Sequence, residues 1–231
     1  MFDLGAIKES LPSFASGALL TFELTLAALA CGMLFALPLS VLRGWPSRWV
    51  AGPVWAFTYV IRGTPLLVQL YLVYYGLGQF EAVRDSFAWP WLRSATFCAI
   101  AAFTLNTCAY TIEILHGAMR AVPAGEIEAA RAMGMTRAVM LRRVVLPSAF
   151  RRMLPAYGNE VILMLQATSL ASAVTLLDLT GAASEMNSRF YLPFESFLSA
   201  AALYLAITMA LVGLFHAAER RWLMPWQART S

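Results

Sequence analysis

Hydrophobic residues occur in five long runs that together account for most of the 231 residues. Each run contains at least the ~20 residues that an α-helix needs to cross about 30 Å of hydrocarbon, at ~1.5 Å per residue. The runs predict five membrane-spanning helices, at roughly 17–42, 53–78, 94–119, 153–174 and 196–218. Because the number of crossings is odd, we expect the two termini on opposite sides of the bilayer.

Composition agrees with an integral membrane protein and argues against several other classes. Hydrophobic residues make up 60% of the chain and charged residues 13%, and the mean hydropathy is +0.65, far from the balance of soluble domains. Cys31, Cys98 and Cys108 fall inside predicted spans without the spacing of metal ligands, so no metal site is predicted. The sequence lacks GxxxxGK[ST], so ATP and Mg are expected on separate subunits and no cofactor in this chain.

Arginine is distributed unevenly between the two ends of the predicted spans. Flanking Lys and Arg are retained on the cytoplasmic side of a membrane. The basic end carries Arg43, Arg48, Arg120, Arg131, Arg137, Arg142, Arg143, Arg151, Arg152, Arg220, Arg221 and Arg229, and the other end only Lys8, Arg84, Arg93 and Arg189. The asymmetry predicts the N-terminus outside and the C-terminus inside. It also accounts for a sequence pI of about 9.2 without a nucleic-acid partner.

The polar segment 121–147, between the third and fourth spans, is cytoplasmic in this topology. Its first part predicts a short helix, because Pro123 suits a first helical turn and early Glu126 and Glu128 are favoured by the helix dipole. Gly134 is expected to end this helix. On the helix, Ile127, Ala130 and Arg131 follow at i, i+3 and i+4, which predicts a small apolar face edged by charge that fits a groove on a partner.

The second part of the segment predicts another helix that leads back to the membrane. Thr136 is positioned to cap it, and the helix is expected to continue to about Val145. Pro147 is expected to interrupt it before the fourth span begins, because proline lacks the N–H that a helix interior needs.

The same segment carries a motif with fixed spacing, which reads Glu128-Ala129-Ala130, three residues, Gly134, nine residues, Val144, one residue, Leu146-Pro147. It resembles the EAA loop of ABC-importer permeases, with Val144 in place of the more usual isoleucine. In that family the loop forms the coupling helix that docks into the ATP-hydrolysing subunit. The resemblance implies this role for residues 126–133 and assigns ATPase coupling to Glu126, Glu128, Ala129, Ala130, Arg131, Gly134, Leu146 and Pro147. An arginine-rich interfacial helix on anionic lipid is the alternative, but it does not call for this motif.

The resemblance extends over the chain, since segments 57–76, 104–134, 146–165 and 218–223 are similar to polar amino acid permeases, most closely those of histidine/lysine/arginine/ornithine and arginine importers. It implies an all-α type I ABC-importer permease fold with a transmembrane domain at 17–219, in the bacterial inner membrane. The chain is then a transport subunit rather than an enzyme. Implied partners are a second permease subunit, identical or homologous, two ATP-binding subunits, and a periplasmic or extracellular amino acid-binding protein.

The expected activity is import of polar, basic amino acids such as arginine, histidine, lysine or ornithine by alternating access. A permease for glutamine, glutamate, cystine or opines remains an alternative from the same family. An ATP-independent secondary transporter is a further alternative, although the five spans show no inverted repeat.

Polar and ionisable residues inside the spans are costly and tend to face a bundle interior or water. In the second span, Gly63 and Pro65 weaken the helix and free backbone groups that need new partners. The candidates for a substrate path lie in the second, third and fourth spans: Arg62, Thr64, Gln69, Asn106, Tyr110, Glu113, Glu160, Gln166, Thr168 and Ser169.

Two interpretations of these polar residues stay open. In the first they hold the helices together, with Glu113 or Glu160 neutralising Arg62 and amides bonding between helices. In the second they line a path for a zwitterionic solute, whose charged groups need replacement hydrogen bonds once dehydrated.

Overall fold

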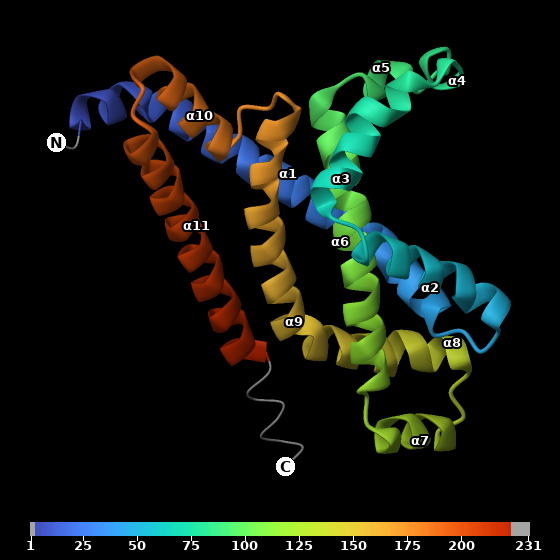
Figure 1. Cartoon of the computed structure of the whole chain (residues 1–231). Coiled ribbons are helices and arrows are strands. Elements are labelled where there is room, and N and C mark those ends of the chain that lie inside the picture. The colour runs from blue at the N-terminus through green and yellow to red at the C-terminus, as the bar shows by residue number, and fades with distance from the viewer. Residues whose placement is uncertain (1–2, 223–231) are drawn as a thin grey trace.

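The computed structural model describes residues 3–222, which form helices and no strand (Figure 1). Arg229 and Leu223, the last residue of the similar segment 218–223, lie outside the described residues. The α-helices are α1 (Leu4–Arg43), α2 (Arg48–Arg62), α3 (Leu66–Tyr71), α4 (Glu81–Arg84), α5 (Trp89–Leu92), α6 (Ala95–Arg120), α7 (Ala124–Ala132), α8 (Arg137–Met140), α9 (Leu146–Ala167), α10 (Leu179–Phe190) and α11 (Pro193–Trp222). Two π-helical turns, Leu72–Gly76 and Leu141–Val145, and two 3₁₀ turns, Leu77–Gln79 and Thr168–Val174, extend them.

Three helices among the described residues are long and apolar enough to cross a membrane: α1, α6 and α11 up to Arg221. Two further crossings are available if a bent pair of helices counts as one span. These pairs are Arg48–Arg62 with Leu66–Gln79, bent by 102°, and Arg137–Val174 with Leu179–Phe190, bent by 47°. The predicted count of five is reached when both bent pairs are included.

Helix α6 occupies the centre of the bundle. Of its most apolar stretch 67% is buried, against 39% for α1 and 6% for α11, so α11 lies at the periphery. Leu24 of α1, Phe103 of α6 and Met164 of α9 meet in the main apolar cluster. Gly32 lets α1 approach α6 closely, because a Cβ there would lie 2.5 Å from the Thr107 methyl group. Small residues at such crossings are typical of membrane helix packing.

The second span is broken where the sequence predicts it to be weak. Helix α2 ends at Arg62 and α3 begins at Leu66, with Gly63 and Pro65 between them. Pro65 has φ −63° and ψ 135°, which is extended backbone, so it starts a new helix in a different direction. The prediction of a weakened helix at this point is confirmed.

The expected interruption at Pro147 is wrong. Helix α8, the π-helical turn Leu141–Val145 and α9 follow one another without a gap, and Pro147 lies in the first turn of α9. Proline has no backbone N–H, but the π turn immediately before Pro147 does not follow the regular i→i−4 pattern that would require one. Proline is also tolerated in a first helical turn. The chain therefore enters the fourth span as one continuous, bent helical segment.

Helix α10 was not expected from the sequence. It begins after Asp178, whose side chain accepts hydrogen bonds from the N–H groups of Thr180 and Gly181 at 3.1 Å each. The Tyr204 hydroxyl of α11 donates to the same carboxylate at 3.1 Å. Gly17 of α1 makes room for this contact, because a Cβ there would lie 2.8 Å from the Asp178 carbonyl oxygen. Asp178 thus ties α1, α10 and α11 together.

Helix α1 is also longer than the predicted first span, because Asp3 caps it and it continues through polar residues before the apolar run. Its first residues lie at the end of the bundle opposite to α7 and to the last described turn of α11 (Figure 1). The first and last described residues thus lie at opposite ends of the bundle. Which end faces the cytoplasm stays a prediction.

Candidate coupling and translocation sites

Helix α7 carries the Glu-Ala-Ala motif and is defined at both ends by local chemistry. It follows Pro123, and its C-terminus is closed by Gly134 at φ +74°, in the left-handed region. The Gly134 N–H donates to the Arg131 carbonyl at 2.9 Å, and the Met135 N–H donates to the Ala130 carbonyl at 3.1 Å. Glycine adopts this conformation without the steric cost that other residues meet. The predicted helix end at Gly134 is confirmed, and Thr136 caps α8 as expected through the Val139 N–H.

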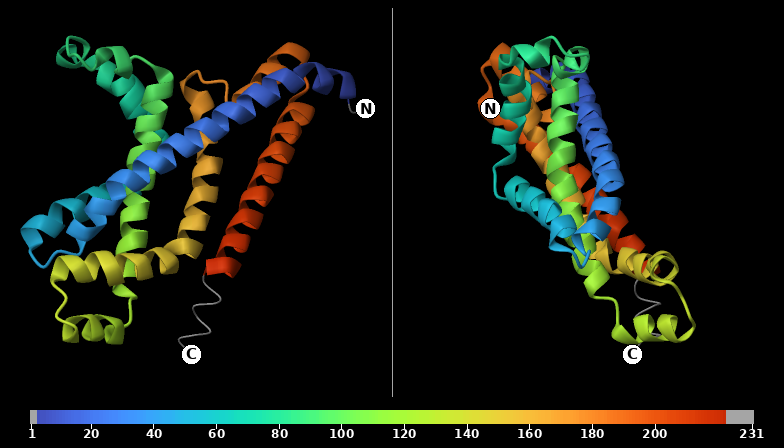
Figure 2. Two further views of the ribbon diagram at one scale, coloured as in Figure 1. Left: turned by 180° about the vertical axis from the view of Figure 1, so that it is seen from behind. Right: turned by 90° about the vertical axis from the view of Figure 1, so that its right-hand side faces the viewer.

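Helix α7 stands apart from the main bundle, below the C-terminal end of α6 (Figures 1 and 2). Ala130 is 1% exposed, whereas Glu128, Ala129, Arg131 and Met133 are exposed. The predicted apolar face for a partner is therefore partly used within the chain, because the loop folds back and buries Ala130. The surface that α7 leaves open contains Glu128 and Ala129 instead.

Glu126 links α7 to the start of the fourth span. Its carboxylate lies 3.8 Å from the Arg152 guanidinium, and the Arg152 Nε donates to the Ser148 hydroxyl at 3.5 Å. Leu146 and Pro147, the last residues of the motif, form the first turn of the same helix. Glu126 and the end of the motif therefore meet at the start of α9.

The break between α2 and α3 is closed by one glutamine. The Gln69 amide nitrogen donates to the Ile61 carbonyl at 2.6 Å and to the Thr64 hydroxyl at 2.8 Å. Its amide oxygen accepts from the Asn106 side chain of α6 at 3.0 Å. The backbone group freed by Pro65 thus finds a partner inside the protein, as membrane depth requires. Gln69, Thr64 and Asn106 form one network.

Arg62 and Glu113 do not pair with each other. The Arg62 guanidinium lies 5.1 Å from the centre of the Tyr110 ring, a cation–π geometry. The Glu113 carboxylate accepts from Arg43 Nε at 2.9 Å and from the Thr58 hydroxyl at 2.8 Å. Of the two carboxylates considered as partners of Arg62, Glu113 is instead paired with Arg43, at the end of α1.

Glu160 forms no direct ion pair with Arg62 among the described residues, but the two charges are close enough to attract each other. It is 5% exposed and accepts a hydrogen bond of 2.8 Å from the Thr107 hydroxyl of α6. Gln166, in the last turn of α9, is exposed. In the 3₁₀ turn Thr168–Val174 that follows, Ser169 is half-buried and Thr168 is fully buried, with its hydroxyl donating to the Leu165 carbonyl at 2.6 Å.

Sequence reasoning missed Arg43, Thr58 and Thr107 as partners of the two carboxylates. Thr58 precedes Arg62 by one helical turn, so both lie on one face of α2. This spacing could have marked Thr58 as a polar residue that faces the same neighbouring helix as Arg62. Arg43 and Thr107 carried no such signal, since their partners come from distant helices.

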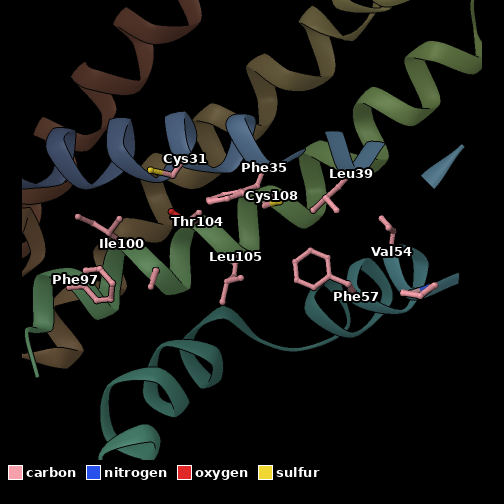
Figure 3. Close-up of a pocket in the computed structure, with 12 residues that line it drawn as sticks. Cys31, Phe35, Leu39, Val54, Phe57, Phe97, Ile100, Thr104, Leu105 and Cys108 are labelled. Atoms are coloured by element: carbon pink, nitrogen blue, oxygen red, sulfur yellow. The ribbon is translucent and has the colours of Figure 1, made fainter. Parts of the chain in front are cut away.

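An apolar cavity of about 760 Å³ opens between α1, α2 and α6 (Figure 3). Phe35, Phe57 and Leu105 project into it, and Thr104 is a polar member of its lining. None of the ten predicted path residues lines it. The cavity therefore offers nothing to a zwitterion and is separate from the polar networks of α6.

Comparison with known proteins decides the family. Residues 28–224 match the model of the binding-protein-dependent transport system inner membrane component. The chain belongs to this permease family. It is 48% identical over 209 residues to the histidine/lysine/arginine/ornithine transport system permease protein HisM of Salmonella typhimurium, covering 90% of this chain and 89% of HisM. It is 45% identical over 214 residues to the octopine transport system permease protein OccM of Rhizobium radiobacter, covering 93% and 87%.

Solved structures agree with the fold of a type I ABC-importer permease. One described as the crystal structure of an amino acid ABC transporter with histidines has a TM-score of 0.86 and 35% identity, covering 96% of this chain and 99% of that one. An inward-facing form of the methionine transporter MetNI shares the fold alone, with a TM-score of 0.70 at 19% identity, over 90% and 95% of the two chains. The permease is thus an inner-membrane transport subunit and not itself an enzyme, and it works with an ATPase and a substrate-binding protein.

Proposed function

We propose that this permease is one of two membrane subunits in an importer for amino acids with cationic side chains. Two separate ATP-binding subunits, which hold ATP and Mg, drive the transport, and an external binding protein delivers the solute. In this proposal α7 lies in the cytoplasm, the N-terminus lies outside, and the pore opens alternately to the two sides. The second membrane subunit is either another copy of this chain or a homologue.

The observation that carries the proposal is the placement of α7. It stands clear of the bundle, presents Glu128 and Ala129 outwards, and is tied to α9 through Glu126 and Arg152 at 3.8 Å. A helix that is held at its ends and open on one face is suited to enter a groove on a partner. Closure of the ATPase pair would move α7, and the link to Arg152 would pass that movement to the fourth span.

The relatives support the substrate class. HisM is named for histidine, lysine, arginine and ornithine, and it is 48% identical to this chain. OccM, named for octopine, is 45% identical, so import of an opine is a second candidate function. Both candidates need a route for charged groups across the membrane.

Exposed polar side chains on the membrane helices support such a route. Arg62, Thr64 and Gln166 are exposed on the chain. Polar groups at membrane depth must face water, solute or another protein chain. We therefore assign these three residues to the path first. Glu113, bound to Arg43 and Thr58, is assigned to helix packing, and so is Glu160, which is 5% exposed and bound to Thr107.

Three measurements test the proposal. The chain should copurify with a soluble ATPase in detergent, and addition of the binding protein should raise ATP turnover. In a competition panel with labelled arginine, unlabelled lysine and histidine should compete better than glutamine. Preferential competition by octopine would support the second candidate, whereas uptake driven by an ion gradient without an ATPase would contradict both.

A further inference from the structure

A pocket with excess positive charge lies at the junction of α7 and α9. Its volume is about 230 Å³. The lining comes from α7, from the π-helical turn Leu141–Val145 and from the first turns of α9, and it consists of Glu126, Arg143, Val144, Pro147, Ser148 and Arg151. The pocket is separate from the polar networks of α6. Its lining residues Glu126 and Pro147 also belong to the set assigned to ATPase coupling, but that set does not include Arg143 or Arg151, which give the pocket its charge.

The positive charges of this pocket are not balanced by other residues in the described part of the chain. Arg143 and Arg151 are exposed, and neither has a hydrogen-bond or ion-pair partner among residues 3–222. The one carboxylate of the lining, Glu126, is already 3.8 Å from Arg152. The Ser148 hydroxyl accepts from Arg152 and can still donate its own proton. Two guanidinium groups and one hydroxyl donor therefore face a small space, which suits phosphate oxygens better than any cation.

The position of the pocket indicates how such a phosphate would be presented. Helix α8 and the start of α9 run across the inner end of the bundle before the chain turns into the fourth span (Figures 1 and 2). Val139 is 38% exposed and Phe150 is 39% exposed on this same stretch. Exposed apolar side chains interspersed with arginines are typical of a helix lying at the headgroup level of a bilayer. A soluble anion would gain nothing from these apolar neighbours, whereas the acyl chains of a phospholipid would pack against them.

We propose that this pocket binds the phosphate group of an anionic phospholipid, held by Arg143 and Arg151 with Ser148 as a further donor. The acyl chains of the lipid lie beside Phe150. Because Glu126 of α7 belongs to the same pocket, the bound lipid occupies the joint between the coupling helix and the fourth span. The inference goes beyond the transport function and needs only that this end of the bundle lies at a membrane surface.

The test counts lipids bound to the full-length permease, purified with its partner subunits, delipidated in neutral detergent and exposed to equal amounts of phosphatidylglycerol and phosphatidylcholine. Native mass spectrometry gives the ratio of the two lipids retained. The unmodified protein should prefer phosphatidylglycerol by roughly tenfold or more: both lipids carry a phosphate, but the choline group of phosphatidylcholine brings a positive charge beside Arg143 and Arg151. The Arg143→Gln/Arg151→Gln double variant should lose the preference.

The matched control is Arg137→Gln/Arg142→Gln, which removes the same charge from the same stretch but from residues that do not line the pocket. It should keep the preference. If both double variants lose it equally, the charge acts diffusely and the proposed site is wrong. If inorganic phosphate displaces phosphatidylglycerol at equal concentration, the pocket is a soluble-anion site and the lipid assignment is wrong.

Folding is controlled by comparing thermal unfolding of the variants in detergent. If the double glutamine variant does not fold, the single variants Arg143→Gln and Arg151→Gln replace it, and each should reduce the preference several-fold. Unchanged preference in both single variants would overturn the proposal. No ATP, binding protein or amino acid is present, so the result is independent of whether the proposed transport function is correct.

Discussion

Replacement of Gly134 by valine is expected to uncouple ATP hydrolysis from uptake while leaving membrane insertion intact. Gly134 has φ +74°, and no heavy atom lies within 4 Å of a Cβ placed there, so the substitution meets no steric obstacle from neighbours. Its cost is confined to the backbone, at about 1–2 kcal/mol for an L-residue in the left-handed region. At ~1.4 kcal/mol per factor of ten, the native end of α7 becomes roughly five- to thirtyfold less favoured.

The two hydrogen bonds that close α7, from Gly134 to Arg131 and from Met135 to Ala130, depend on this backbone conformation. Their loss should let the exposed helix end fray and weaken its docking on the ATPase. The assay is reconstitution in liposomes with the binding protein, followed by labelled arginine uptake and phosphate release from the same sample. The ratio of uptake to ATP hydrolysed should fall several-fold in the valine variant.

Gly134→Asn provides the matched control, because asparagine tolerates the left-handed region far better than valine. The asparagine variant should keep a ratio close to that of the unmodified protein, at equal amounts in the membrane. If valine and asparagine variants both transport with an unchanged ratio, the conformation at Gly134 does not determine coupling and the docking role of α7 is refuted.

Two further substitutions test the packing of the bundle. Glu113→Gln should lower the free energy of unfolding by about 1–3 kcal/mol, because it removes the charged partner of Arg43. Thermal unfolding in detergent measures this loss, and the double variant with Arg43→Gln should recover part of it. If Glu113→Gln keeps full stability but changes the preference between arginine and glutamine, Glu113 contacts the solute instead. Gly17→Ala should also destabilise by about 1–3 kcal/mol, since its Cβ would lie 2.8 Å from the Asp178 carbonyl oxygen. Gly117→Ala, with nothing within 4 Å of the added carbon, should unfold at the unchanged temperature, and equal behaviour of the two alanine variants would disprove the close approach of α1 to α10.

The elements that the sequence predicted well are those with a strong local signal. Long apolar runs marked α6 and α11, and Gly63 and Pro65 marked the break after α2. Gly134 and Thr136 marked the ends of α7 and α8, because caps depend on one or two residues. Pro147 was misjudged for the same local reason, since the π-helical turn that accommodates it has no sequence signature comparable to a cap.

Elements and contacts that depend on tertiary structure could not be predicted. Helix α10 is stabilised by Asp178, and the value of that cap depends on Tyr204 and Gly17 from other helices. Sequence reasoning left Glu113 open between an ion pair and the substrate path, and its pairing with Arg43 follows from the packing of α1 against α6. The spacing of residues in the sequence predicts which of them share a face of one helix. It does not predict which other helix packs against that face.

The central claim is that α7 couples an ATPase to transport through this permease. The most direct measurement is ATP turnover by the purified complex in liposomes, with and without the binding protein loaded with arginine. We expect the loaded binding protein to raise turnover several-fold, and we expect the Gly134→Val variant to hydrolyse ATP with little uptake. A permease that purifies without an ATPase and accumulates arginine from an ion gradient alone would contradict the claim.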